Sequence, residues 1–489
     1  MPSRERISNV DKAWLRMDRP SNLMQIVGVM LFEGELDFER LRLAVEQRML
    51  AHRRFIQRVV AEGTGYSWQD DPDFDLGNHL RRVVRRGRLG KAGLQRFVAD
   101  LVSRPLDPGR PLWEMLVVDT ALGGQALVLR IHHSIADGIA LVGVVLALAD
   151  CTEEAAKGSH QSPAANGNDD DDDHEHDVFW QALWRPVADA VLGSARFVLD
   201  LRNQYGPLLS SPGQLIGIAR AGRDIAAEIA KLALMANDSP TRFKGKPGTR
   251  KELAWSEPIP LPEIKGVGKV LGCSVNDLLL AAVAGSLRAY LVDRGDGVAG
   301  VEIRAMVPVN LRGPADLGKL GNRFGLVALE LPVGIENPLA RLFEVRERMA
   351  KLKGSYQAGL TLTILGVVGM LPKAIQQAVL DLLANKATAV MTNVPGPSSA
   401  LYLAGARLRQ PLFWVPQSGD IGMGVSILSY DGNVQFGLMT DHKLVPDPQS
   451  IVDRFASEFD KFLMLVLMEP WERLGDPDAV AAALAEELP

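Results

Sequence analysis

The sequence predicts an α/β protein made of two units, and three observations support this fold class. Strand-like alternation and helix-like spacing of apolar residues succeed one another from residue 25 onward. A second series of such elements begins near residue 249. The segment between the two series starts with a run rich in acid, Gly, Ser and Pro. A chain of 489 residues is long enough for two or three domains of roughly 150 residues each.

The first predicted unit covers residues 1–150. Its apolar residues alternate as in strands over 25–32, 55–60, 113–118 and 126–131, and they recur at helical spacing over 37–52 and 139–149. Toward the end of the unit the order is therefore strand, turn, strand, polar elbow and helix. This mixture is typical of an α/β or α+β domain.

The rest of the chain divides into three predicted parts. Residues 151–178 form a flexible acidic linker, residues 179–248 a helical crossover and residues 249–489 the second α/β unit. In the second unit we expect strands at 251–255, 302–309, 326–331, 387–393, 424–430 and 433–440, and helices at 262–271, 276–292, 338–353 and 448–468.

Composition and charge exclude several classes of protein. A net charge of −5 provides no global basic field, so we expect no nucleic-acid partner. The two cysteines, Cys151 and Cys273, form neither a disulfide framework nor a thiolate metal cluster, and they suit a reducing compartment. We see no signal peptide and no apolar run of the ~20 residues that a spanning helix needs. We therefore expect a cytoplasmic protein, and the apolar helical faces of 179–235 leave peripheral contact with a lipid surface open.

The strongest chemical signal lies where a hydrophobic strand gives way to an apolar helix, at residues 131–138. His132 and His133 are neighbours on a strand end, so their side chains point to opposite faces and only one can enter a given cleft. A neutral imidazole is well suited to take a proton from an alcohol or thiol at neutral pH. Asp137 would cap the helix or hold an arginine, and Gly138 permits a tight turn.

Two other interpretations of this histidine pair stay open. Both histidines would be core or capping residues if the pattern had no chemical role. A metal site built from two histidines and an aspartate is disfavoured, because neighbouring strand residues diverge and no histidine pair has the i, i+4 spacing. We expect no bound metal.

The run HHSIADG at residues 132–138 matches the HHxxxDG signature of the CoA-dependent acyltransferase superfamily, which includes chloramphenicol acetyltransferase, carnitine acyltransferases and peptide-synthetase condensation domains. Five further motifs occur at residues 16–24 (RMDRPSNLM), 110–114 (RPLWE), 274–277 (SVND), 307–312 (VPVNLR) and 393–397 (NVPGP). With them the chain resembles the bacterial wax ester synthase/diacylglycerol acyltransferase family. The resemblance covers residues 7–462, apart from the acidic run 169–177, which the family pattern lacks.

This resemblance implies a fold of two chloramphenicol-acetyltransferase-like domains, with mixed sheets flanked by helices and the active site at their interface. It also implies transfer of a fatty acyl group from acyl-CoA to a long-chain alcohol or diacylglycerol, forming a wax ester or triacylglycerol without a covalent acyl-enzyme. Acyl-CoA is then a substrate, and no cofactor is expected. A membrane or lipid-inclusion surface is an open peripheral partner.

The resemblance also assigns roles to single residues. His133 is expected to be the general base that deprotonates the acceptor hydroxyl, with His132 supporting it. Asp137, next to Gly138, is expected to be structural and paired with Arg312. Asn276 is the candidate for orienting the substrate or the oxyanion, and an N-cap role for Asn276 is equally open.

The remaining candidates line the expected substrate site. Pro111, Leu112 and Trp113 would border the acyl tunnel, although a core role for Trp113 is equally open. Asp277 is counted with Arg312 among the residues near substrate, and it also suits the start of the helix at 276–292. The basic cluster at 81–91 would either bind CoA phosphates or form a solvated face.

Two alternatives to this function stay open. In the first, the enzyme is an acyltransferase that uses another acceptor, such as a shorter alcohol, an amine or a carrier-bound acyl group. Otherwise the chain would be a catalytically idle protein that binds acyl chains at a lipid surface.

Overall fold

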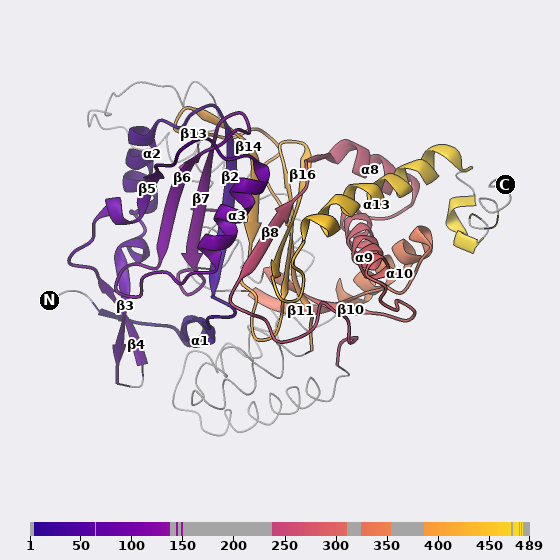
Figure 1. Cartoon of the computed structure of the whole chain (residues 1–489), viewed down its shortest axis with the longest axis horizontal. Coiled ribbons are helices and arrows are strands. Elements are labelled where there is room, and N and C mark those ends of the chain that lie inside the picture. The colour runs from indigo at the N-terminus through magenta and orange to yellow at the C-terminus, as the bar shows by residue number, and fades with distance from the viewer. Residues whose placement is uncertain are drawn as a thin grey trace, which may run out of the picture.

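The structure is a computed structural model of the chain. It describes residues 4–63, 65–136, 143–144, 148–149, 237–310, 324–353, 386–470, 473–478, 480 and 482. Within these residues the strands form a six-stranded sheet, a seven-stranded sheet and a small three-stranded sheet. Figure 1 shows the two large sheets side by side, with the N-terminal half in indigo and purple.

The first half of the chain alternates strands and helices as its hydrophobic periods predict. Its strands are β1 (Arg4–Arg6), β2 (Gln25–Glu33), β3 (Gln57–Glu62), β4 (Gly65–Asp70), β5 (Leu80–Val83), β6 (Trp113–Asp119) and β7 (Gln125–His132). Its helices are α1 (Asn9–Met17), α2 (Phe38–Ala44) and α3 (Lys91–Val102). The predicted helix at 37–52 starts as α2 and continues as a π-helical turn at Val45–Met49. The strand predicted from residue 55 begins later, because Arg53–Ile56 form a 3-10 turn.

The second half builds a sheet covered by helices on one face. Its strands are β8 (Lys251–Trp255), β9 (Ile259–Pro260), β10 (Ile303–Asn310), β11 (Phe324–Leu331), β12 (Ala389–Pro395), β13 (Tyr402–Leu403), β14 (Ala406–Trp414), β15 (Met423–Tyr430) and β16 (Asn433–Asp441). Its helices are α8 (Leu261–Val270), α9 (Val275–Asp293), α10 (Pro338–Lys353) and α13 (Gln449–Met468), which agree with the predicted helices to within a residue or two at each end. The seven-stranded sheet has the order β11-β10-β12-β15-β16-β8, with β9 also paired to β16.

Strands from the second half complete the first sheet. The six-stranded sheet has the order β13-β14-β2-β7-β6-β5 (Figure 1). In it β14 lies antiparallel to β2, with Trp414 opposite Val27. The predicted unit 249–489 therefore supplies two strands to the N-terminal sheet. A division of the chain by sequence at residue 249 does not foresee this exchange.

The two sheets share a hydrophobic layer, which holds the halves of the protein together. Val27 and Val128 of the first sheet, residues Leu94 and Val98 of α3 and residue Trp255 of β8 are buried in this layer. Trp255 lies with its ring centroid 6.3 Å from that of Trp414. Burial of large aromatic rings on both sides makes this boundary a core rather than a hinge.

The structure contains several helices and strands that the sequence pattern did not predict. The hydrophobic pattern did not predict α1, α3, β4, β5 or β14. The predicted helix at 139–149 lies mostly outside the described residues, and the acidic linker lies wholly outside them. The described end of the predicted helical crossover, residues 237–248, has neither helix nor strand. One described helix, Val275–Asp293, has the length and composition to span a membrane, and 72% of its apolar window is buried inside the protein, as in a core helix.

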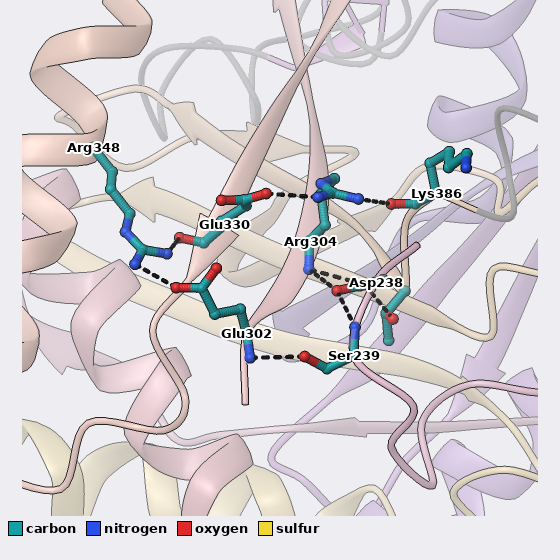
Figure 2. A network of polar contacts seen from close by, with 8 residues as sticks. Asp238, Ser239, Glu302, Arg304, Glu330, Arg348 and Lys386 are labelled. Atoms are coloured by element: carbon teal, nitrogen blue, oxygen red, sulfur yellow. Dashed lines mark hydrogen bonds and ion pairs between the residues drawn. The ribbon is translucent and has the colours of Figure 1, made fainter. Parts of the chain in front are cut away.

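A buried carboxylate fastens the chain where it returns from the crossover. Asp238 accepts the backbone N–H of Arg304 on β10 at 2.9 Å and the hydroxyl of Thr388 at 2.5 Å (Figure 2). The Arg304 guanidinium donates to the carbonyl of Lys386 and to Glu330. Burial, the dominant influence, raises the pKa of Asp238, and the hydrogen bonds oppose this shift. The network ties residue 238 to the start of β10 and to the residues just before β12, two neighbouring strands inside the second sheet.

We predict that Asp238→Ala lowers the free energy of unfolding by about 2–4 kcal/mol, because it leaves the Arg304 amide and the Thr388 hydroxyl without their acceptor. Asp238→Asn keeps an acceptor for the amide and should cost about 1 kcal/mol or less. Denaturant unfolding of both variants measures the difference. Equal losses in the two variants would contradict this account of the network.

Candidate active site

Backbone hydrogen bonds on two sides fix the histidine pair. The N–H of His132, at the end of β7, donates to the carbonyl of Leu112 at 2.9 Å. The N–H of His133 donates to the carbonyl of Met24, just ahead of β2, at 2.7 Å. Both side chains are buried. The strand end therefore presents two imidazoles from a backbone that its neighbours hold in place.

The His132 ring is held as a neutral imidazole. Its Nδ1 accepts the backbone N–H of Ser134 at 3.1 Å and lies 2.8 Å from the Ser134 hydroxyl oxygen. The proton of the neutral ring is therefore on Nε2, which lies 3.9 Å from Oδ2 of Asp18, too far for a hydrogen bond. Burial, with a smaller contribution from His133, lowers the pKa of His132 to about 3. His132 is thus a poor base at neutral pH.

The His133 ring lies in different surroundings. It stacks on the ring of Trp14, with centroids 4.2 Å apart and planes inclined by 23°. Trp14 projects from α1 and packs in a small apolar cluster with Met17 and Met24, against which Leu326 of β11 also packs. The histidine expected to act as base is therefore placed where the N-terminal helix meets the C-terminal sheet. Sequence analysis missed Trp14, although its helical spacing with Met17 could have revealed it.

The segment between α1 and β2 is a tight, bonded loop. Asp18 accepts the N–H of Met24 at 2.8 Å, and Arg19 and Asn22 exchange backbone hydrogen bonds. Burial, the dominant influence, raises the pKa of Asp18, and the hydrogen bond from Met24 opposes this shift. The loop presents the Met24 carbonyl to His133 in a defined position.

The contacts at the start of α9 show which residues cap this helix and what Asn276 and Asp277 each bind. Ser274 is the N-cap, and with Asp277 it forms a capping box in which each side chain accepts the other residue's backbone N–H. The N-cap interpretation of Asn276 is therefore wrong, because Ser274 fills that position. Asp277 stabilises the helix start, as its alternative role predicted. Asn276 instead accepts a hydrogen bond of 2.6 Å from the Asn393 amide, which links α9 to β12.

Residues 111–113, at the start of β6 and predicted to line the substrate site, are packed into the protein core. Trp113 is fully buried, donates its ring N–H to the carbonyl of Phe55 at 2.7 Å and stacks on His79 with centroids 4.7 Å apart. These contacts match the core alternative for Trp113. Pro111 and Leu112 are also buried, and the Leu112 carbonyl supports the backbone of the histidine pair. An acyl-tunnel role for this segment stays a prediction.

A buried ion pair lies on the strands next to the histidines. Arg130 of β7 pairs with Glu114 of β6. Its guanidinium also donates to Gln25, to the carbonyl of Leu101 in the last turn of α3 and to the carbonyl of Arg104 just after that helix. This network anchors the C-terminal end of α3 to the strands that carry the site. Sequence analysis did not identify it, because alternation marks both positions only as strand residues.

The predicted basic cluster is largely engaged in ion pairs with acidic neighbours. Arg81 pairs with Glu114, Arg82 with Asp119, Arg88 with Glu35 and Lys91 with Glu257. These pairs favour the solvated-face interpretation. Arg81 and Arg82 lie in β5 and the rest of the cluster follows it. The parallel partner of β5, β6, runs away from the histidine end of the sheet.

Three predicted site residues lie outside the described residues: Asp137, Gly138 and Arg312. The predicted Asp137–Arg312 ion pair stays a prediction. Over the part of the chain that the structure describes, no group of three or more His, Cys, Asp or Glu side chains is arranged to hold a metal ion.

Comparisons with known proteins agree on one family. The family model for the wax ester synthase/diacylglycerol acyltransferase catalytic domain matches residues 7–279, and the model for the C-terminal domain of that family matches residues 320–462. A probable diacylglycerol O-acyltransferase of Mycobacterium tuberculosis H37Rv is 29% identical over 453 residues, which cover 90% of this chain and 92% of that protein. A putative diacylglycerol O-acyltransferase of Mycobacterium tuberculosis H37Rv is 24% identical, covering 94% of this chain and 90% of its own length.

Solved structures show the same fold. The wax ester synthase/diacylglycerol acyltransferase of Marinobacter aquaeolei VT8 superposes with a TM-score of 0.66 at 20% identity, covering 95% of this chain and all of that one. The starter condensation domain of rhizomide synthetase superposes with a TM-score of 0.57 at 12% identity, and the match covers 96% of each chain. The predicted fold of two domains with mixed sheets and flanking helices is confirmed.

The neutral state of His132 leads to a testable pH dependence. In the unfolded chain an ordinary histidine binds a proton below a pKa of about 6.5, whereas folded His132 stays neutral until about 3. The unfolded state thus binds more protons as the pH falls from about 6.5, so this group's contribution to stability decreases toward acid. We predict that the unfolding free energy of His132→Asn, which keeps an acceptor near the Ser134 N–H, depends less on pH. Between pH 7 and pH 5 it should decrease by about 2 kcal/mol less than that of the intact protein. Urea unfolding of both proteins at the two pH values measures it, and identical pH dependences would contradict it.

Proposed function

The chain belongs to the wax ester synthase/diacylglycerol acyltransferase family, and from this we propose that it transfers a fatty acyl group from acyl-CoA to the hydroxyl of a long-chain alcohol or diacylglycerol. The products are a wax ester or triacylglycerol and free CoA. The observation that carries the proposal is the match of two family models in order, together with the buried histidine pair at the end of β7.

His133 is the general base in this proposal. Its imidazole takes the proton from the acceptor hydroxyl while the hydroxyl oxygen attacks the carbonyl carbon of the thioester. The tetrahedral intermediate collapses with cleavage of the carbon–sulfur bond, and the imidazolium returns the proton to the CoA thiolate. His132 does not suit this step, because its Nδ1 is engaged with Ser134 and its pKa is about 3.

The surroundings of His133 support this role by limiting its motion. The hydrogen bond from the His133 backbone N–H to the Met24 carbonyl fixes the backbone, and the stack on Trp14 fixes the plane of the ring. A base that is already oriented loses little conformational freedom when the acceptor arrives. The aromatic face also supplies an apolar wall beside the imidazole, which suits a site for fatty substrates.

Asn276 is the proposed donor to the oxyanion or to the bound substrate. Its Oδ1 accepts the hydrogen bond from Asn393, so its Nδ2 group is left as the donor. Because Ser274 already caps the helix, the Asn276 side chain is not needed for helix initiation. Its place in the first turn of α9 also puts it near the positive end of the helix dipole, which favours a developing negative charge.

The chemistry of the substrates suggests where the enzyme works. Fatty alcohols, diacylglycerol and both products are poorly soluble in water and collect in lipid phases. We therefore propose a cytoplasmic enzyme that touches a membrane or lipid-droplet surface peripherally while it binds the acceptor.

The direct test measures release of the CoA thiol from palmitoyl-CoA with hexadecanol, with a diacylglycerol or with no acceptor. We expect acceptor-dependent release from the intact protein, and a loss of about 10²–10⁴-fold in His133→Ala with folding retained. His442→Ala is the matched control, since this half-exposed histidine pairs with Glu252 on the surface and should leave the rate unchanged.

Three outcomes separate the alternatives. Release that appears only when an amine or a short alcohol replaces the lipid acceptor in the same assay would assign a different acceptor. Binding of acyl-CoA without release would assign an acyl-chain binding protein instead. Full activity of His133→Ala would show that another residue is the base.

A second prediction separates the role of Asn276 from the stability of its helix. Asn276→Ala should lower kcat by about 10²–10³-fold, the usual loss when one oxyanion donor is removed. Ser274→Ala should instead lower the unfolding free energy by about 1 kcal/mol with little change in kcat, because it removes the cap alone. Steady-state kinetics and thermal unfolding of both variants test this, and a similar kcat in Asn276→Ala and the intact protein would refute the donor role.

A further inference from the structure

A buried ion pair in the C-terminal half lies outside the site described above. Lys251 begins β8, Asp441 ends β16, and the two residues are directly opposite in the antiparallel register. The Lys251 ammonium lies 3.1 Å from Oδ2 of Asp441 and 2.8 Å from Oδ1 of Asn22. Exposure is 6% for Lys251, 0% for Asp441 and 1% for Asn22, so all three polar groups are out of reach of solvent.

Asn22 is the point at which this pair reaches the N-terminal half. Its side-chain amide also donates to the carbonyls of Gly419 at 2.6 Å and Ile421 at 3.2 Å. These three side-chain hydrogen bonds of Asn22 go to the C-terminal half, although Asn22 itself belongs to the loop before β2. The partners that hold this loop lie between 229 and 399 residues after Asn22 in the sequence, on the other side of the boundary between the halves.

The path from Asn22 to the histidine is short. Asn22 precedes Met24 by two residues in the tight loop, and the Met24 carbonyl accepts the N–H of His133 at 2.7 Å. A second contact steadies the same region, because the backbone N–H of Lys251 donates to Ser103 at 2.9 Å, just after α3. A shift of the Lys251 side chain would therefore reach His133 through one loop of a few residues.

Burial of this charged pair requires an explanation other than stability. Taking an ammonium and a carboxylate out of water costs several kcal/mol per ion, and their attraction often does no more than offset that cost. Burial lowers the pKa of Lys251, and Asp441 opposes the shift. In some proteins a buried polar or ionic group is retained because it selects one arrangement of the chain. Here the selected arrangement is that of residues 18–24.

We propose that Lys251 and Asp441, acting through Asn22, are positioning residues that set the place of His133. In this arrangement the C-terminal half of the chain determines the geometry of the base carried by the N-terminal half. The catalytic consequence rests on the proposed function of His133. The structural consequence, a loop that loosens when the pair is broken, stands without it.

The first experiment measures the structural consequence by amide hydrogen exchange on the full-length protein. Lys251→Met keeps the length of the side chain and removes its charge. We expect faster exchange in peptides containing residues 19–25 and 132–134. The control is Arg341→Met, which breaks the buried Arg341–Glu458 ion pair between α10 and α13 and the hydrogen bond from Arg341 to the Ala281 carbonyl of α9. The control should loosen its own helices and leave the two site peptides unchanged.

The second experiment measures kinetics on the same variants. Lys251→Met should lower kcat by roughly ten- to a hundredfold, the scale expected when a reacting group is displaced by about an ångström. The KM for acyl-CoA should change by no more than about threefold, because substrate contacts are not removed. Lys251→Arg, which keeps a donor toward Asn22 and Asp441, should recover much of the rate.

A double variant separates positioning from stability. Lys251→Met with Asp441→Asn removes the orphaned carboxylate, so thermal stability should recover toward that of the intact protein. The bond to Asn22 is still missing, so kcat should stay low. Recovery of kcat together with stability would overturn the proposal and leave the pair a purely structural one.

The outcomes also distinguish this proposal from the proposed function. An intact protein without acceptor-dependent CoA release would refute the acyltransferase function, and the exchange experiment would still decide the positioning role. Unchanged exchange at 19–25 and 132–134 in Lys251→Met would refute the positioning role, whatever the activity of the intact protein.

Discussion

The hydrogen bond from the His133 amide to the Met24 carbonyl is the interaction on which the site depends. It joins the end of β7 to the loop that leads from α1 into β2, and this loop is bonded in turn to the C-terminal half through Asn22. Trp14, at the other end of the same stretch, covers the His133 ring. One short stretch of backbone thus fixes the base from behind and from one face.

The exchange of strands between the halves explains why this geometry can be held. β14 comes from the second half of the chain and pairs with β2, so the first sheet is incomplete without it. The layer that contains Trp255 and Trp414 then buries both sheets against each other. Two halves joined in this way move relative to one another only by disrupting a hydrophobic core. A site at their boundary is therefore as rigid as an ordinary domain interior.

Sequence analysis predicted most of the elements whose information is local, and it could not predict those that depend on distant partners. The strands around His132 and His133 have clear alternation, and the change of period after them marked the site. β14 was missed because residues 406–414 include Pro411 and mix charged with apolar residues. Its partner strand β2 is also distant in sequence: Arg407 of β14 and Glu33 of β2, which contact each other, are 374 residues apart. Lys251 and Asp441 are likewise unremarkable in sequence, since only the register of β8 with β16 brings them together.

The two neighbouring histidines lie in different surroundings, although their sequence context is almost the same. Burial and the bonds to Ser134 keep His132 neutral, and the nearness of His133 contributes to its lowered pKa. In the proposed mechanism a proton taken from the acceptor hydroxyl goes to His133, since two adjacent imidazolium ions in a buried setting would repel one another. It stays on His133 until the leaving thiolate takes it. The proposal thus divides the work between adjacent histidines on a strand end, with His132 bonded to the Ser134 backbone and His133 handling the proton.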